Sequence, residues 1–369
     1  MNKKLWIVFA ASFSVLSLTN NPAYALTPFE ELGEFLYFDE NLSDPNGQSC
    51  ASCHHPTQGF ADPDTNLPVS EGVITGRFGG RNAPTSSYAV FFPPFKLQGK
   101  KAIGGQFWDG RASTLADQAK GPFLNPVEMN NLKPGEADYV GKARVLQDIV
   151  DSDYQALFTQ ECGAVDLNSE QSINIAYDCM ADAIGAFEST PILSPFTSKF
   201  DAVMAGTEQF TEQEEQGFAL FSGKAKCSHC HSTSTPDGAT AAIFTDNEYH
   251  NIGLPVNPEI ATLIGEPQPV DLGLGGRSDI PQEPRYRGKF KTSHLRNIAL
   301  TPPYMHNGVL ETLSEVVDFY NTRDIEGMWP PAEVPENLDS KFIGDLKLTP
   351  EEVAAIVAFM ETLTDGYTQ

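Results

Sequence analysis

Histidine is scarce in this chain and is missing from most of its first half. Only 7 of the 369 residues are histidines, and none occurs between His55 and His229. Residues 56–226 therefore offer no imidazole to a metal ion. A metal centre built from that segment must use other donors.

Basic residues are also few. The chain has 24 Lys and Arg against 49 Asp and Glu, a formal net charge of −25 at pH 7. A negative field of this size repels nucleic acid and anionic membrane surfaces, so both are excluded as partners. It would favour a basic partner, although many exported proteins are acidic simply for solubility.

No apolar run of this chain is long enough to predict a membrane span. The longest, at 5–18, follows Lys3 and Lys4 and is short and interrupted. An A-x-A pattern at 23–25 then offers a cleavage site. The sequence predicts a cleaved signal peptide at 1–25 and export to the periplasm. An uncleaved N-terminal anchor is the alternative.

Alternating apolar and polar residues, the pattern of half-buried strands, are rare. The stretches 56–106 and 251–289 are instead rich in glycine and proline. Helix starts are marked by capping boxes, in which a threonine is followed three residues later by a glutamate. These begin at Thr27, Thr211, Thr312 and Thr349. The fold is therefore predicted to be mainly α, with long loops and few strands.

Cysteine is limited to six residues, four of which form two C-x-x-C-H motifs, at 50–54 and 227–231. In such a motif two thioether bonds fix the porphyrin, and the following histidine lies beneath the ring to ligate iron. A structural zinc site would not need a histidine directly after each cysteine pair. Two covalent haem c groups are predicted. Their ligating and attaching residues are Cys50, Cys53, His54, Cys227, Cys230 and His231.

The two halves of the chain begin alike. In each, a capping box leads into an apolar helix and then to a haem motif, and the motifs lie 177 positions apart. This indicates a duplicated cytochrome unit. A boundary near 190–206 predicts an N-terminal c-type domain at 26–195 and a C-terminal one at 196–369. The remaining cysteines, Cys162 and Cys179, are either a disulfide, which export makes plausible, or two buried thiols.

The second iron ligand differs between the haems. If haem one takes its distal face from its own half, no histidine is available there, and Met129 and Met180 are the thioethers to consider. An iron with a vacant sixth coordination position can bind peroxide, whereas an iron with all six positions filled only transfers electrons. For haem two, Tyr320 lies on the apolar stripe of the helix after Thr312, where periodicity alone favours a core tyrosine. Met305 and His306 are rival ligands.

Several motifs resemble those of bacterial dihaem cytochrome c peroxidases. They are the two haem motifs, F-W-D-G-R at 107–111, N-P-V-E-M at 125–129 and L-R-N-I-A-L-T-P-P-Y-M-H-N-G at 295–308. The resemblance covers nearly the whole mature chain. It is greatest for the MauG-like (MbnH-like) branch, because the capping histidine of reductively activated peroxidases is missing after the first haem motif. In this branch a tyrosine replaces the methionine ligand of the second haem, and Tyr320 falls at that position, which favours it over Met305.

The resemblance also implies roles for other residues. Trp108 matches the electron bridge between the haems, Glu128 the distal carboxylate over the open haem, and Gln118 a companion amide. Pro122 matches a position of the family's distal pocket that is small, and His306 matches a position of the family near haem two. The residues that match an interhaem calcium site are Asn82, Thr301 and Pro303.

The implied activity is a peroxide-dependent oxidation carried out by an enzyme with hydrogen peroxide and a partner protein as substrates. In MauG-like proteins the oxidising equivalents are spread over both haems as a bis-Fe(IV) state, which oxidises a residue, here expected to be a tryptophan, of the partner. The alternative is reduction of peroxide to water with electrons from a small cytochrome or cupredoxin. One departure concerns the surface tryptophan that MauG has before the second haem motif. Here 224–226 reads Lys-Ala-Lys, which disfavours the methylamine dehydrogenase precursor as substrate.

Overall fold

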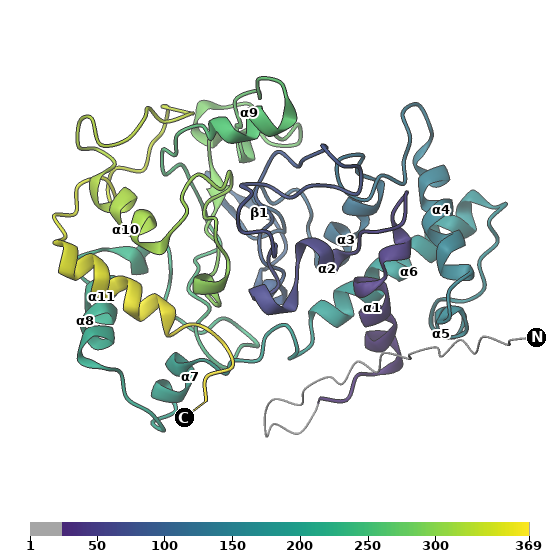
Figure 1. The fold of residues 1–369 in the computed structure, drawn as a ribbon, viewed down its shortest axis with the longest axis horizontal. Helices are drawn as coiled ribbons and strands as arrows, with labels where there is room; N and C mark the ends of the chain where they lie inside the picture. Colours follow the sequence, from purple (N-terminus) through teal and green to yellow (C-terminus); the bar gives the residue numbers. More distant parts are fainter. Residues whose placement is uncertain (1–23, 369) are drawn as a thin grey trace, which may run out of the picture.

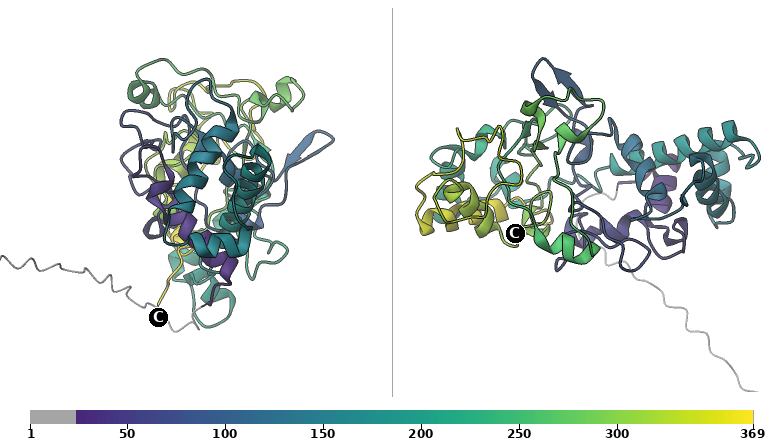
Figure 2. Two further views of the ribbon diagram at one scale, coloured as in Figure 1. Left: turned by 90° about the vertical axis from the view of Figure 1, so that its right-hand side faces the viewer. Right: turned by 90° about the horizontal axis from the view of Figure 1, so that it is seen from above.

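The computed structural model of the protein describes residues 24–368. The expected signal peptide lies outside the described residues, apart from Tyr24 and Ala25. Two groups of helices stand at opposite ends of an elongated molecule, with long loops between them (Figures 1 and 2). Among the described helices, none is long and apolar enough to cross a membrane.

The first half supplies one helical group. Its helices are α1 Pro28–Phe38, α2 Cys50–Cys53, α3 Leu115–Leu124, α4 Asp138–Val150, α5 Gln155–Cys162 and α6 Glu170–Glu188. The second half supplies the other group and α9. Its helices are α7 Lys199–Met204, α8 Glu212–Ser222, α9 Pro258–Ile264, α10 Leu313–Thr322 and α11 Pro350–Glu361.

Short 3₁₀ turns and two small antiparallel strand pairs complete the secondary structure of the described residues. The turns are η1 Glu40–Leu42, η2 Pro56–Gln58, η3 Ala89–Phe91, η4 Cys227–His229, η5 Leu274–Gly276, η6 Pro284–Tyr286 and η7 Ile298–Leu300. Strands β1 Lys96–Gln98 and β2 Lys101–Ile103 pair antiparallel, with Lys96 opposite Ile103. Strands β3 Tyr249–His250 and β4 Phe290–Lys291 also pair antiparallel, with Tyr249 opposite Lys291. The prediction of a mainly helical protein with few strands is confirmed.

The capping boxes begin helices where the sequence predicted them. In α1, α8, α10 and α11 the threonine oxygen accepts from the third helical amide, and the glutamate side chain accepts from the threonine amide. Each box satisfies two of the donors that a helix start leaves unpaired. The last helix ends at Glu361, where Thr362 caps it.

The same helix crossing occurs in both halves. Gly33 of α1 packs directly on the backbone of Ala183 in α6, and Gly217 of α8 packs in the same way on Ala355 in α11. At either glycine a Cβ atom would overlap the facing carbonyl group. Each crossing brings the helix before a haem motif against the last helix of its half.

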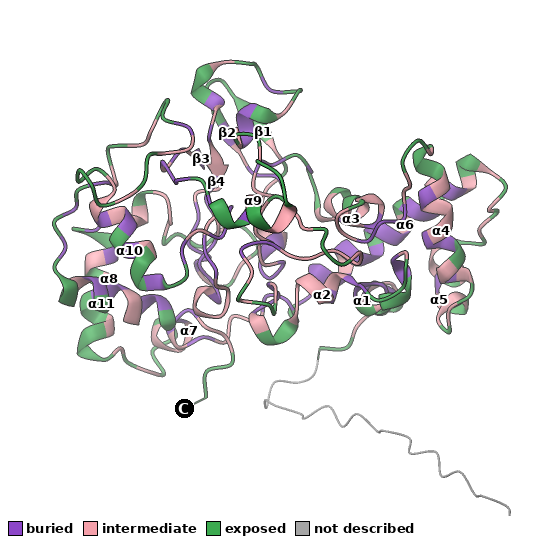
Figure 3. Ribbon diagram, turned by 45° about the horizontal axis from the view of Figure 1, so that its top comes forward, coloured by how far each residue is buried: buried purple, intermediate pink, exposed green. Residues whose placement is uncertain are grey.

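Each helical group encloses a hydrophobic core. One cluster of buried apolar side chains runs from Leu32 to Leu193, and a second runs from Phe200 to Leu363. The inner faces of α6 and α11 are buried, whereas α9 and the β1–β2 hairpin are largely exposed (Figure 3). Cys162 and Cys179 form a disulfide that joins α5 to α6, which confirms the disulfide over two free thiols.

Candidate dihaem site

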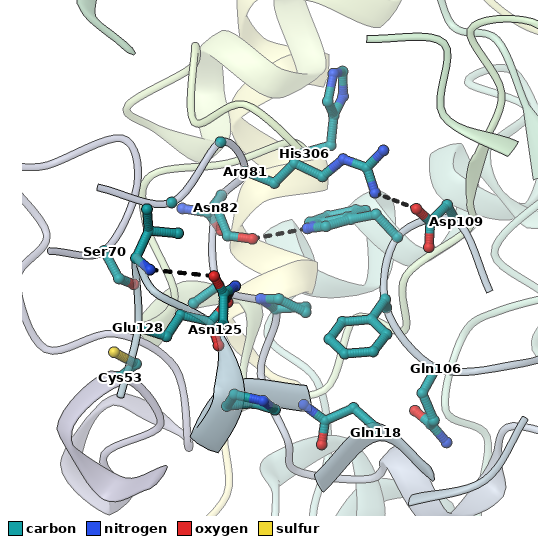
Figure 4. A pocket seen from close by; sticks show the side chains of 18 of the residues that line it. Cys53, Ser70, Arg81, Asn82, Gln106, Asp109, Gln118, Asn125, Glu128 and His306 are labelled. Atoms are coloured by element: carbon teal, nitrogen blue, oxygen red, sulfur yellow. Dashed lines mark hydrogen bonds and ion pairs between the residues drawn. The ribbon is translucent and has the colours of Figure 1, made fainter. Parts of the chain in front are cut away.

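The first haem motif opens onto a large cavity. Cys50, Cys53 and His54, from α2 and the residue after it, line a cavity of about 640 Å³. Glu128 and Gln118 line the same cavity (Figure 4). The structure therefore brings together the attachment residues of haem one and the two residues expected at its distal side.

The donor set of this cavity fits a covalent haem. Cys50 and Cys53 are free thiols, as thioether attachment requires. Burial lowers the pKa of His54 to about 4, partly offset by the carbonyl groups of Phe60 and Pro84, so its ring is neutral at pH 7. Only a neutral imidazole has a lone pair for iron.

Glu128 lies in the turn that follows helix α3. That helix contains Pro122, and its C-cap residue, Asn125, lies three positions before Glu128. The Asn125 amide nitrogen donates to Glu128 Oε1 over 2.7 Å. Burial raises the pKa of the Glu128 carboxyl group, while Asn125 and Arg111 partly lower it. A raised pKa means that this carboxylate holds a proton more readily than an exposed one, which suits it to proton transfer.

The second half of the chain also lines the first cavity. Residues of α9 and the loop behind it, together with His306, contribute to its wall. The first cavity is therefore lined by both halves of the chain, and His306 brings an imidazole to its wall that residues 56–226 do not offer. His306 Nε2 is buried without a hydrogen-bond partner among the described residues. His306 stacks on Phe290, with ring centroids 3.6 Å apart.

The second haem motif opens onto a smaller cavity of about 160 Å³. Cys227, Cys230 and His231 line it. His231 Nδ1 donates to the Phe244 carbonyl oxygen over 2.9 Å, which leaves Nε2 as the atom free to bind a metal. The burial of the His231 ring lowers its pKa, so the neutral form is favoured. This donor set also fits a covalent haem.

All three candidate ligands of haem two line this second cavity. Tyr320 projects from α10, and Met305 and His306 come from the loop before that helix. Burial raises the pKa of the Tyr320 phenol, and the nearby Cys230 and Cys227 raise it further. No described residue forms a hydrogen bond with the Tyr320 hydroxyl group. The half-buried Tyr320 hydroxyl group is therefore available to an iron in this cavity.

Trp108 lies between the two haem cavities. It lines both of them, and His306 is the other residue that does so. The Trp108 indole nitrogen donates to the Asn82 carbonyl oxygen over 2.9 Å, and the Trp108 carbonyl group accepts from the Lys291 amide over 2.9 Å. Trp108 is thus held at both its ring nitrogen and its backbone.

A third, small cavity of about 100 Å³ adjoins Trp108. The three residues expected to ligate calcium, Asn82, Thr301 and Pro303, all line it. The Asn82 amide nitrogen donates to the Pro68 carbonyl oxygen over 3.1 Å, which leaves the Asn82 amide oxygen as an available ligand. An amide oxygen and backbone carbonyl groups are donors that suit a hard cation such as calcium.

Sequence reasoning missed two residues that the structure places at the first cavity. Arg81 joins Asp109 of the first half to Asp271 of the second, at 2.6 and 2.7 Å. Glu188, at the end of α6, is only 5% exposed and lines the cavity with Oε2 unpartnered. Neither residue belongs to a short motif, so only its burial and its contacts identify it.

Comparisons with known proteins agree with this geometry. A family model described as "Di-haem cytochrome c peroxidase" matches residues 28–209. The methylamine utilization protein MauG of Paracoccus denitrificans is 40% identical over 351 residues, which cover 90% of this chain and 88% of that protein. The cytochrome c551 peroxidase of Pseudomonas aeruginosa is 29% identical over 335 residues, covering 90% and 78%.

Two solved structures show the same fold over nearly the whole chain. The diheme peroxidase BthA from Burkholderia thailandensis superposes with a TM-score of 0.80 at 30% identity, covering 95% of this chain and 89% of that one. A MauG-like protein associated with microbial copper homeostasis superposes with a TM-score of 0.68 at 32% identity, covering 93% and 91%.

Proposed function

The chain belongs to the dihaem cytochrome c peroxidase and MauG family of peroxide-using oxidoreductases, and from this premise we propose that it oxidises a residue, a tryptophan, of a partner protein. The observation that carries the proposal is the position of Trp108 in the walls of both haem cavities. A residue shared by both cavities allows two oxidising equivalents to be divided between the haems. The proposal places the enzyme in the periplasm.

The electron balance sets what the chain must provide. Reduction of hydrogen peroxide to two water molecules consumes two electrons and two protons, and the partner residue supplies both electrons. The two haems, when bound, supply the iron that cleaves peroxide and the centres that store its oxidising equivalents. The protein must therefore move protons in the first cavity and electrons between the cavities.

Glu128 is proposed to move the proton. Its raised pKa lets the carboxylate take a proton from one peroxide oxygen and return it to the other. The Asn125 amide fixes the position of the carboxylate through its bond to Oε1. Gln118 lines the same cavity and is proposed to help orient the peroxide.

Tyr320 is proposed as the second ligand of haem two, with His231 as the first. A phenolate donates more strongly to iron than a thioether, so it lowers the haem potential and favours storage of an oxidising equivalent. Asn82, Thr301 and Pro303 are proposed to hold calcium beside Trp108. That cation would fix the loops on both sides of the bridge.

The second candidate function is peroxide detoxification with a small cytochrome or cupredoxin as electron donor. Relatives that carry the name cytochrome c551 peroxidase favour it. The Lys-Ala-Lys sequence at 224–226 also provides no surface tryptophan next to haem two. Peroxide would react at the first haem under either function. The two candidate functions differ in what supplies the electrons.

The test adds one equivalent of peroxide to the fully oxidised protein that carries both haems. We expect the ferric electron paramagnetic resonance signals of both haems to decrease together, with a new near-infrared band and without prior reduction. Trp108→Phe should slow the response of the second haem. Glu128→Gln should slow the reaction with peroxide by about 10² to 10⁴. A reaction that needs one-electron reduction first would favour the detoxification candidate, and no reaction in either state would contradict both.

A further inference from the structure

The exposed edge of the second haem cavity is basic, although the chain as a whole is acidic. Lys226 and Lys341 are both exposed there, and neither forms an ion pair with any described residue. Their charges are therefore available to a partner. The positive charge of this edge contrasts with the net charge of −25 for the whole chain.

An aromatic pair lies between these two lysines. The rings of His229 and Phe342 stack with centroids 4.1 Å apart and an interplanar angle of 27°. The Lys341 ammonium lies 4.7 Å from the centroid of the Phe342 ring. The Lys226 ammonium donates to the Lys341 carbonyl oxygen over 3.3 Å, which joins the two loops. We call Lys226, His229, Lys341 and Phe342 the basic rim.

The basic rim lies directly on the second haem site. Lys226 and Phe342 both line the second cavity. His229 stands inside the second C-x-x-C-H motif, one position before Cys230. A protein seated on the rim would therefore be separated from haem two by a single layer of side chains.

Carboxylates near the rim are already paired. Glu352 binds Lys224 and Asp345 binds Lys347. Asp339 Oδ2 lies 3.4 Å from His250 Nδ1. The local charge that a partner meets is thus set by Lys226 and Lys341.

We propose that the basic rim is a docking surface for a partner protein with an acidic patch, whose electrons enter through haem two. The inference rests on the proposed function only in assuming that a protein supplies the electrons. Whole-molecule charge alone would favour a basic partner, but charges beyond about 8 Å are largely screened at physiological ionic strength. The charges at the contact surface therefore decide which partner fits.

The test measures binding to the oxidised protein, without peroxide. The probes are an oxidised acidic cupredoxin and an oxidised basic cytochrome c, at low and at physiological ionic strength. The variant Lys226→Glu/Lys341→Glu reverses the rim. The matched control, Lys96→Glu/Lys100→Glu, reverses two exposed lysines near the β1–β2 turn that also form no ion pair with described residues.

We expect the cupredoxin to bind the wild-type protein more tightly than the cytochrome does. Its affinity should fall roughly tenfold or more at low ionic strength in the rim variant, and much less in the control. Tighter binding of the basic cytochrome, or equal losses in both variants, would overturn the inference. Haem absorbance and circular dichroism establish that both variants fold.

A second measurement separates this inference from the proposed function. Peroxide consumption with hydroquinone, a small neutral donor, should be unchanged in the single variant Lys341→Glu, since Lys341 lines neither haem cavity and that donor needs no docking surface. If the wild-type protein consumes no peroxide with hydroquinone, the proposed function fails. The binding comparison is made without peroxide, so it decides the docking surface in either case.

Discussion

At the scale of single residues, the ligand of haem two depends on Tyr320 and Met305, which line the same cavity. We predict that Tyr320→Phe changes the spin state of haem two and raises its reduction potential, because the anionic donor is lost. The matched variant, Met305→Leu, should leave the spectrum unchanged. Absorption and electron paramagnetic resonance spectra at pH 7 provide the measurement. If Met305→Leu alone changes the spectrum, the thioether is the ligand.

Glu188 is a buried acid that the proposed chemistry does not use. Burial raises the pKa of its carboxyl group to about 8, so the group is protonated in the folded protein at neutral pH. In the unfolded chain a glutamate ionises near its ordinary pKa of about 4.3. At a pH between these two pKa values, Glu188 has lost its proton in the unfolded state and has kept it in the folded state. The free energy of unfolding therefore falls as pH rises through this window.

We predict that Glu188→Gln removes this loss of stability. The difference in free energy of unfolding between the variant and the wild-type protein should be small at pH 4.5. It should grow in favour of the variant towards pH 8, by up to about 1.4 kcal/mol per pH unit. Urea denaturation at several pH values provides the measurement. Parallel pH profiles of the two proteins would show that Glu188 ionises normally.

The contrast between Glu128 and Glu188 shows what a sequence can say about one acid among 49. Glu128 stands in a recognisable motif, so its role could be predicted by resemblance. Glu188 stands in an ordinary helix and is marked only by its burial. Burial of a single carboxyl group depends on distant parts of the chain, and no local pattern encodes it.

At the scale of elements, the repeated helix crossing determines how the helices of each half pack. Gly33 and Gly217 occupy equivalent places, and each lets two helices approach until backbone meets backbone. The sequence showed the repeated helix starts and haem motifs. It did not show which helix each one crosses, because that partner lies more than 130 residues away along the chain.

We predict that Gly217→Ala destabilises the protein by about 1–3 kcal/mol or more, because a Cβ has no room against the Ala355 carbonyl group. The control, Gly80→Ala, places a methyl group where no atom lies within 4 Å and where the backbone is not left-handed. It should change the stability by less than about 0.5 kcal/mol. Thermal unfolding followed by circular dichroism compares the two, and similar losses in both would contradict the packing argument.

At the scale of the whole molecule, the two halves are tied together over the first cavity. Arg81 binds Asp109 through Nη1 and both carboxylate oxygens of Asp271 through Nε and Nη2. Asp271 belongs to the loop that follows α9 and lines that cavity. A segment of the second half thus controls the surroundings of the first haem site.

We predict that Asp271→Asn loosens this loop. Hydrogen exchange at 256–276 should become faster by an amount equivalent to about 1–2 kcal/mol, since two charge-assisted bonds are lost from a partly exposed site. The control, Asp279→Asn, breaks the more exposed pair with Arg277 and should have a smaller effect. Mass spectrometry of exchanged peptides provides the measurement. Unchanged exchange at 256–276 would show that other contacts hold the loop.

The sequence by itself determined the haem motifs, the helix starts and the mainly helical class, because each depends on residues a few positions apart. Export and the domain boundary at 195/196 stay predictions. Only the tertiary structure decided which residues share a cavity. It placed Trp108 and His306 between the haem sites, folded a loop of the second half over the first cavity and gathered Lys226 and Lys341 beside haem two. These groupings depend on contacts between distant segments, which local spacing cannot encode.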